Sequence, residues 1–131
     1  MGAAANRRGG GRGGACAWHP VHVAWLVSDG VVLASAEVAA DRPSRRKGLL
    51  GRDGMEGALV LQGCRWIHTV GMHFPLDVAY LDGEGNVIKT VRMRRHRVGA
   101  PVWGARWIIE AEAGAFARWG LHVGLVVELR E

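Results

Sequence analysis

Short apolar runs rich in β-branched and aromatic residues follow one another along most of this chain, and each ends at glycine, proline, asparagine or aspartate. Such runs are typical of β-strands, and turn residues at this close spacing leave room for short helices only. The pattern predicts a mainly β, single-domain antiparallel sandwich or barrel-like fold with one or two short helices. The expected strands cover residues 22–27, 31–39, 58–62, 65–70, 76–81, 86–93, 107–112 and 123–130.

Two turns and two helices complete the expected organisation. Asp29-Gly30 between two apolar runs predicts a tight hairpin, and the glycine-rich loop 82–86 predicts a second one. A short helix is expected over 43–50, with Asp41 as its N-cap and Pro43 in its first turn. One or two further helical turns are expected over 113–119.

The positive charge of the chain is concentrated at its N-terminus. Residues 1–14 carry three arginines and no acid, so they account for +3 of the net charge of +5 and leave +2 to the rest. We expect 1–14 to be a flexible Arg/Gly leader and 21–131 to form a single β domain. A domain at +2 is not basic enough to indicate a nucleic-acid-binding protein by its charge balance.

Cysteine content and hydropathy favour a cytoplasmic location. The two cysteines, Cys16 and Cys64, do not make a disulfide framework, and reduced thiols are the simpler interpretation. No window approaches the ~18 uninterrupted apolar residues that a membrane span requires. Glycine follows the N-terminal arginines where a secretory signal would have an apolar region, so no membrane partner is expected.

The segment from Cys64 to Asp82 collects most of the chemically versatile side chains. On an extended strand, Cys64, His68 and Met72 would share one face, and such soft ligands suit copper(I) or zinc. Cys64 and Met72 would, however, lie eight strand rises apart, roughly 26 Å, and no CxxC or HxxxH motif is present. We therefore expect no metal and no cofactor, and we interpret Cys64 and Met72 as core residues.

His68 and Thr69 are adjacent polar residues in an otherwise apolar run and therefore need partners, one of which Asp77 could supply. An Asp77–His68 pair would hold the imidazole in one tautomer and raise its basicity, as in the general base of a hydrolase or lyase. The same pair could simply hold the Phe74-Pro75 turn. A triad with Cys64 has the right residue types but lacks a nucleophile-elbow sequence.

Arginines supply two candidate sites for anions. Arg45 and Arg52 are seven residues apart and would share a helix face only if the helix ran two full turns; such a pair could bind a carboxylate or phosphate, and solvated surface charge is the alternative. The run Arg92–Arg97 would place Arg92 and Arg94 on one strand face. We interpret it as edge charge that prevents strand addition, with nucleic acid as the alternative. Trp103 and Trp107 could then stack on bases, but core positions are the preferred interpretation.

Three separated segments, within roughly residues 37–130, resemble the bacterial and archaeal family called domain of unknown function 192. RRKGLLGR (45–52) is similar to R-x-x-G-L-M-x-R, and FPLDVAYLD (74–82) is similar to I-P-L-D-V-x-F-x-D. Ile109-Glu110, Gly114 and Gly120 follow the L-E-x-x-x-G ending. The chain departs from the family at 68–72, where many members have W-M-K-N-T, and at Leu125. The resemblance implies a compact, mainly β domain and no established activity.

Together, the residues predict a domain that binds a small anionic ligand or acts as an accessory or interaction module. The expected ligand-binding residues are Arg45, Arg52, His68, Thr69 and Asp77. A hydrolase or lyase that uses His68 with Asp77 is one alternative, and nucleic-acid contact through Arg92–Arg97 is the other. Nucleic acid is not the expected partner, and both enzymatic activity and oligomeric state stay open.

Overall fold

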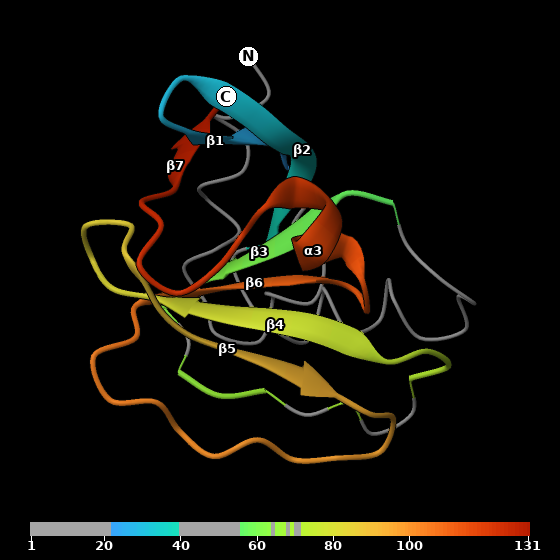
Figure 1. Ribbon diagram of the computed structural model, residues 1–131. Coiled ribbons are helices and arrows are strands. Elements are labelled where there is room, and N and C mark those ends of the chain that lie inside the picture. Colours follow the sequence, from blue (N-terminus) through green and yellow to red (C-terminus); the bar gives the residue numbers. More distant parts are fainter. Residues whose placement is uncertain (1–21, 40–55, 64, 68, 70–71) are drawn as a thin grey trace, which may run out of the picture.

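The computed structural model describes residues 22–39, 56–63, 65–67, 69 and 72–131 (Figure 1). The expected leader (1–14) and the expected first helix (43–50) lie outside these residues. The described elements are β1 (His22–Ser28), β2 (Val31–Ala39), β3 (Ala58–Gln62), β4 (Leu76–Leu81), β5 (Val87–Met93), β6 (Trp107–Glu112), α3 (Ala115–Trp119) and β7 (Glu128–Arg130). The predicted mainly β class is confirmed, and α3 is the helix expected over 113–119.

The seven strands form one sheet in the order β5-β4-β6-β3-β2-β1-β7. Five of the six neighbouring pairs are antiparallel, in agreement with the predicted mainly antiparallel fold, and β2 and β3 are parallel. Parallel neighbours need a long crossover, and residues 40–57 provide it. The sheet is not closed into a barrel, because β5 and β7 form its two edges. An isolated antiparallel bridge pairs Asn86, just before β5, with Val126, just before β7.

Both predicted hairpin turns are present. Asp29 and Gly30 have positive φ angles of 53° and 77°, as a two-residue type I′ turn between β1 and β2 requires. In the β4–β5 loop, Asp82 Oδ1 accepts hydrogen bonds from the backbone N–H groups of Glu84 and Asn86, each at 2.9 Å. These bonds, with the one from Asn86 N–H contributing most, hold the pKa of Asp82 below its ordinary value.

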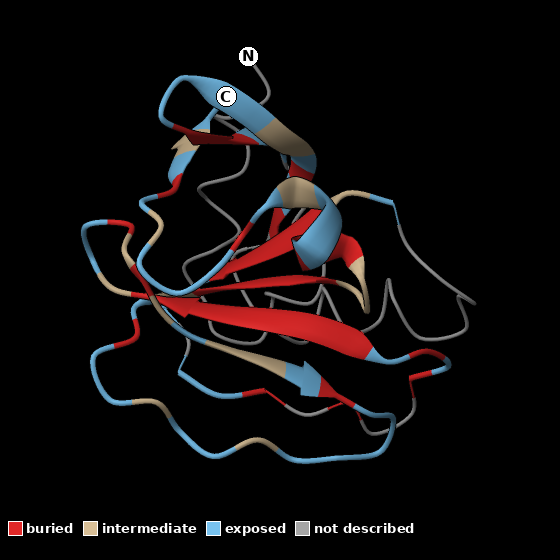
Figure 2. Cartoon of the chain, in the orientation of Figure 1, coloured by how far each residue is buried: buried red, intermediate tan, exposed pale blue. Residues whose placement is uncertain are grey.

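Apolar side chains cover both faces of the sheet. All six residues of β4 are buried, which agrees with a continuous apolar run in a central strand (Figure 2). The side that packs against α3, called the helix face, contains Ala24, Leu26, Ala36, Val38, Ala58, Val60, Ala79, Leu81, Val87, Ile109, Ala111, Ala115, Phe116, Leu121 and Val127. The opposite side, called the loop face, contains Leu59, Leu61, Ile67, Met72, Phe74, Leu76, Val78, Tyr80, Met93, Ala105 and Ile108.

The strand predicted over 65–70 is wrong for the residues described there, which are not assigned to any strand. Arg65 and Ile67 accept hydrogen bonds from the backbone N–H groups of Val102 and Gly99, at 3.0 and 2.9 Å. The opposing segment contains a proline without an N–H, and His96 there has a positive φ of 59°. Both features interrupt a regular ladder of backbone hydrogen bonds, so these two segments share only a few such bonds and do not form a strand pair.

The last predicted strand, 123–130, shortens to β7. Gly124 adopts a positive φ of 97° in a turn where Leu125 N–H donates to His122 O at 3.1 Å. Such a turn breaks the extended backbone, so residues 123–125 do not join a strand. The prediction that Arg92 and Arg94 share one strand face is also wrong, because β5 ends at Met93 and Arg94 lies outside the strand.

Core positions are predicted for four side chains: Met72, Cys64, Trp103 and Trp107. Met72 is fully buried, so its core assignment is confirmed, whereas Cys64 lies outside the described residues. Trp107 packs against the helix-face cluster and donates Nε1–H to Asp82 O at 3.0 Å, as a core anchor would. Trp103 is 78% exposed, which contradicts its core assignment. It follows a proline in a surface turn, and the guanidinium of Arg65 lies 5.7 Å from its ring centre.

In the part of the chain that the structure describes, no helix has the length and apolar character needed to cross a bilayer.

Candidate functional site

Thr69 is fully buried and holds the turn formed by Arg94–Arg97, called the arginine turn. Its hydroxyl donates to the carbonyl of Arg94 at 2.6 Å and accepts from the backbone N–H of Arg97 at 2.9 Å. Its own backbone N–H donates to Arg97 O at 2.7 Å, and its carbonyl accepts from His96 N–H at 2.9 Å. One threonine therefore bonds four backbone groups of a turn that includes a left-handed residue.

Asp77 is buried in β4 and organises the helix face. Its Oδ2 accepts hydrogen bonds from the backbone N–H groups of Gly114 and Phe116, at 2.9 and 3.1 Å. Gly114 is the N-cap of α3 and has no side chain to cap the helix, so Asp77 supplies the cap from another strand. Its Oδ1 forms a salt bridge with Arg92 Nε at 3.0 Å.

These contacts show where the predicted binding residues lie. Thr69 and Asp77 are bonded to different segments, and Asp77 uses both of its carboxylate oxygens in doing so. Arg45, Arg52 and His68 lie outside the described residues. The shared pocket and the His68–Asp77 pair therefore stay predictions. Thr69 and Asp77 both bond to the segment Arg92–Arg97: Thr69 to the backbone of Arg94 and Arg97, and Asp77 to the side chain of Arg92.

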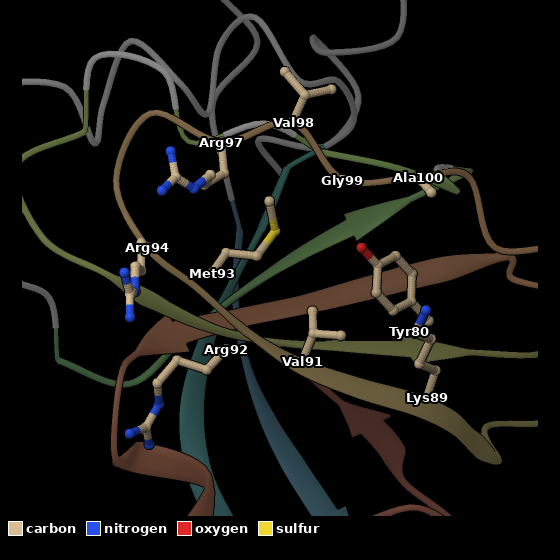
Figure 3. Close-up of a pocket in the computed structure, with 10 residues that line it drawn as sticks. All are labelled: Tyr80, Lys89, Val91, Arg92, Met93, Arg94, Arg97, Val98, Gly99 and Ala100. Carbon is tan, nitrogen blue, oxygen red and sulfur yellow. The ribbon is translucent and has the colours of Figure 1, made fainter.

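A hollow of about 400 Å³ opens beside the edge strand β5 (Figure 3). Its lining residues are Tyr80, Lys89, Val91, Arg92, Met93, Arg94, Arg97, Val98, Gly99 and Ala100. Val91 and Met93 stand opposite Val78 and Leu76 of β4, so they belong to the loop face with Tyr80. In Figure 3 the Arg92 side chain leads away from Val91 and Tyr80, in agreement with its bond to Asp77 on the helix face.

The charges at this pocket are cationic and lack acidic partners. Lys89, Arg94 and Arg97 are exposed, and none of them forms an ion pair with a described acid. Arg94 and Arg97 also line a neighbouring hollow of about 340 Å³ with Pro75, Arg95 and His96. Arg92, in contrast, is paired with Asp77. The pocket rim is therefore a concentration of positive charge that forms no ion pair with an acid in the described ranges, Arg92 excepted.

Tyr80 forms part of the pocket floor, and only 2% of its surface is exposed. A Cβ atom placed on Gly99 would lie 3.4 Å from the Tyr80 hydroxyl, so that hydroxyl faces the backbone of the pocket wall. Burial raises the pKa of Tyr80, and the negative charge of Glu110 raises it further. The phenol therefore stays a neutral hydrogen-bond donor over the ordinary pH range.

Glu110 is a second buried polar residue of the loop face. It is fully buried in β6 and stands opposite Leu59 of β3 and Val78 of β4. It lies two residues along β6 from Ile108, the cross-strand partner of Tyr80, and therefore stands on the same face as that tyrosine. Among the residues with described positions, no group of three histidine, cysteine, aspartate or glutamate side chains could hold a metal ion.

The sequence-based prediction missed Tyr80 and Lys89 and assigned the arginine turn to edge protection. A signal for Tyr80 was present, because it is the one residue with a hydroxyl in the apolar run 76–81. Lys89 stands opposite Tyr80 in the β4–β5 pair. This pairing depends on the strand register, which shifts between Tyr80 and Leu81. The edge position of β5 agrees with the prediction for the basic run.

Two crystal structures share this fold. A protein of unknown function from Novosphingobium aromaticivorans matches with a TM-score of 0.66 and 18% identity, over 82% of this chain and 84% of that one. A protein from Sinorhizobium meliloti, described as a candidate transcription regulator, matches with a TM-score of 0.63 and 18% identity, over 82% and 92%. Identities this low show the fold alone. A comparison with curated proteins gives no match.

A family model extends the comparison to nearly the whole described chain. The model of DUF192, described as an uncharacterised ACR, matches residues 24–129. This range includes every strand from β2 to β6, α3 and the pocket beside β5. The resemblance of the three sequence segments is thereby confirmed, and the chain belongs to the DUF192 family.

Proposed function

We propose that this protein binds a small anionic ligand in the pocket beside β5. The observation that carries this proposal is the group of three exposed cations, Lys89, Arg94 and Arg97, around a hollow of about 400 Å³ with no acidic partner among the described residues. A hollow of this size accommodates a small organic molecule. Guanidinium groups bind carboxylates and phosphates through paired hydrogen bonds, which makes an anion the fitting ligand.

Thr69 and Asp77 act as positioning residues in this site. Thr69 holds the backbone from which Arg94 and Arg97 project, and a fixed backbone lowers the entropy lost when these side chains bind. Asp77 keeps Arg92 on the helix face, away from the ligand. Arg45, Arg52 and His68 stay in the proposal as predicted contacts.

Nucleic-acid contact is the second candidate. It is favoured by the exposure of Arg94, Arg95 and Arg97 on one turn and by the exposed ring of Trp103. Arginines bind phosphates and an exposed aromatic ring can stack on a base. The shape of the site favours the small ligand, because a pocket is not needed for backbone contacts along a strand.

The test is isothermal titration calorimetry with phenyl phosphate and inorganic phosphate. We expect the double variant Arg94→Gln/Arg97→Gln to bind phenyl phosphate roughly tenfold or more weakly than the unmodified protein, because two charge-assisted contacts are lost. Arg118→Gln is the matched control, since Arg118 is an exposed arginine on α3. Equal losses in both variants contradict the proposal.

A single-stranded oligonucleotide titrated at several salt concentrations separates the two candidates. Binding whose affinity falls steeply with salt, together with no saturable binding of either phosphate, supports nucleic-acid contact instead.

A further inference from the structure

We propose that Tyr80 is the specificity-determining donor of this pocket and selects an organic anion that carries a neutral oxygen acceptor on an apolar body. This inference rests on the proposed function and names the class of ligand for the same pocket.

The state of the Tyr80 hydroxyl is the first support. Tyr80 is only 2% exposed, no residue in the described ranges forms a hydrogen bond with its hydroxyl, and the hydroxyl oxygen is not one of the fully enclosed atoms without a partner, which agrees with its position on the pocket lining. Figure 3 shows the hydroxyl directed toward Gly99 and Ala100, which form the wall of the pocket. Buried polar groups in proteins are nearly always bonded, so an open donor that lines a pocket points to a ligand or a bound water as its partner.

The middle of the pocket is the second support. Val91 and Met93 lie between Tyr80 on one side and Arg94 and Arg97 on the other (Figure 3), and Val98 also lines the pocket. An inorganic ion held by the arginines would leave this apolar surface in contact with water. An apolar body attached to the anion would cover it and gain the free energy of that burial.

The charge near the floor decides which part of the ligand meets Tyr80. Glu110 is fully buried on the same face of the sheet as Tyr80, two residues along β6 from Ile108, the cross-strand partner of Tyr80, and it raises the pKa of Tyr80. A second negative group at this position would be repelled. The anionic group therefore belongs with Arg94 and Arg97, on the side of the pocket away from Tyr80, and a neutral carbonyl or hydroxyl oxygen belongs next to Tyr80.

Two aryl phosphates of nearly the same shape test this assignment. 4-Acetylphenyl phosphate carries a neutral carbonyl opposite the phosphate, and 4-ethylphenyl phosphate has a methylene group in its place. We expect the unmodified protein to bind the acetyl compound roughly fivefold more tightly, as one net hydrogen bond allows. In Tyr80→Phe the two compounds should bind equally, and calorimetric titration measures both ratios.

Gly99→Ala provides a second variant that keeps the tyrosine. The added methyl would lie 3.4 Å from the Tyr80 hydroxyl and 3.3 Å from Ile67 O, so it narrows the approach to the donor. We expect it to reduce the preference for the acetyl compound, and to change nothing further when it is combined with Tyr80→Phe. Circular dichroism and thermal unfolding establish that each variant is folded.

The outcomes separate this inference from the function on which it rests. An acetyl preference that persists in Tyr80→Phe overturns the role of Tyr80, and so does inorganic phosphate binding as tightly as both aryl compounds. In either case the anion site itself stands. Absence of binding for all three phosphates overturns the proposed function and this inference together.

Discussion

Asp77 and Tyr80 lie three residues apart in β4 and are both buried, but they serve opposite faces of the sheet. On the helix face, the Asp77 carboxylate accepts hydrogen bonds from Gly114, Phe116 and Arg92. On the loop face, the Tyr80 hydroxyl receives none from the described residues and faces a pocket. The difference teaches that burial of a polar group does not reveal its role, whereas the state of its hydrogen bonds does.

The largest effect on stability is expected from substituting Asp77, whose carboxylate accepts several hydrogen bonds. Asp77→Ala removes the acceptor for two backbone N–H groups of α3 and leaves Arg92 without its partner. We expect the free energy of unfolding to fall by about 3 kcal/mol, measured by urea denaturation. Asp77→Asn keeps one acceptor oxygen and should lose less. A change within about 0.5 kcal/mol for Asp77→Ala would contradict the capping role.

Thr69 extends the comparison to the loop face, where it is the buried polar residue with a full set of bonds. Thr69→Val keeps the shape but leaves the carbonyl of Arg94 and the N–H of Arg97 without their partner. We expect a loss of about 2 kcal/mol in the free energy of unfolding, and weaker anion binding because the arginine turn loosens. Thr69→Ser retains the hydroxyl and serves as the control. Equal stability of the valine and serine variants would show that the hydroxyl bonds contribute nothing.

The smallest effect on stability is expected from Tyr80→Phe, because no hydrogen bond within the described residues is lost. We expect a change within about 0.5 kcal/mol at neutral pH. The pH dependence is more informative: a pKa raised above the ordinary 10.0 stabilises the fold below that pH, and this stabilisation is lost as pH rises through the higher value in the folded protein.

Tyr80 is the only tyrosine in the sequence, so the phenolate absorbance in the near ultraviolet reports on it alone. The folded protein should titrate above 10.0 and the protein in denaturant close to it, while Tyr80→Phe should lose less stability at alkaline pH. A titration in the folded state at the ordinary value would show that the phenol is open to solvent.

Sequence patterns predicted the elements whose causes lie close together in the chain. The Asp29-Gly30 turn and the mostly apolar strand β4 depend on neighbouring residues, and both are observed. The run 65–70 has the same composition as a strand, yet its described residues lie opposite a segment interrupted by His96 and Pro101. That segment is about thirty residues away, so local propensity does not report on it.

The candidate site shows the same division. The sequence determined that Thr69 needed partners, because polar side chains in apolar runs are buried with the strands that carry them, and it offered Asp77 as a hydrogen-bonding group. Only the tertiary structure decided which partners: Arg94 is 25 residues from Thr69, and Phe116 is 39 residues from Asp77. The pocket beside β5 likewise arises where the β4–β5 register meets a distant turn. Hydrophobic periodicity is a property of the chain, whereas the pairing of distant polar groups depends on how the sheet is assembled.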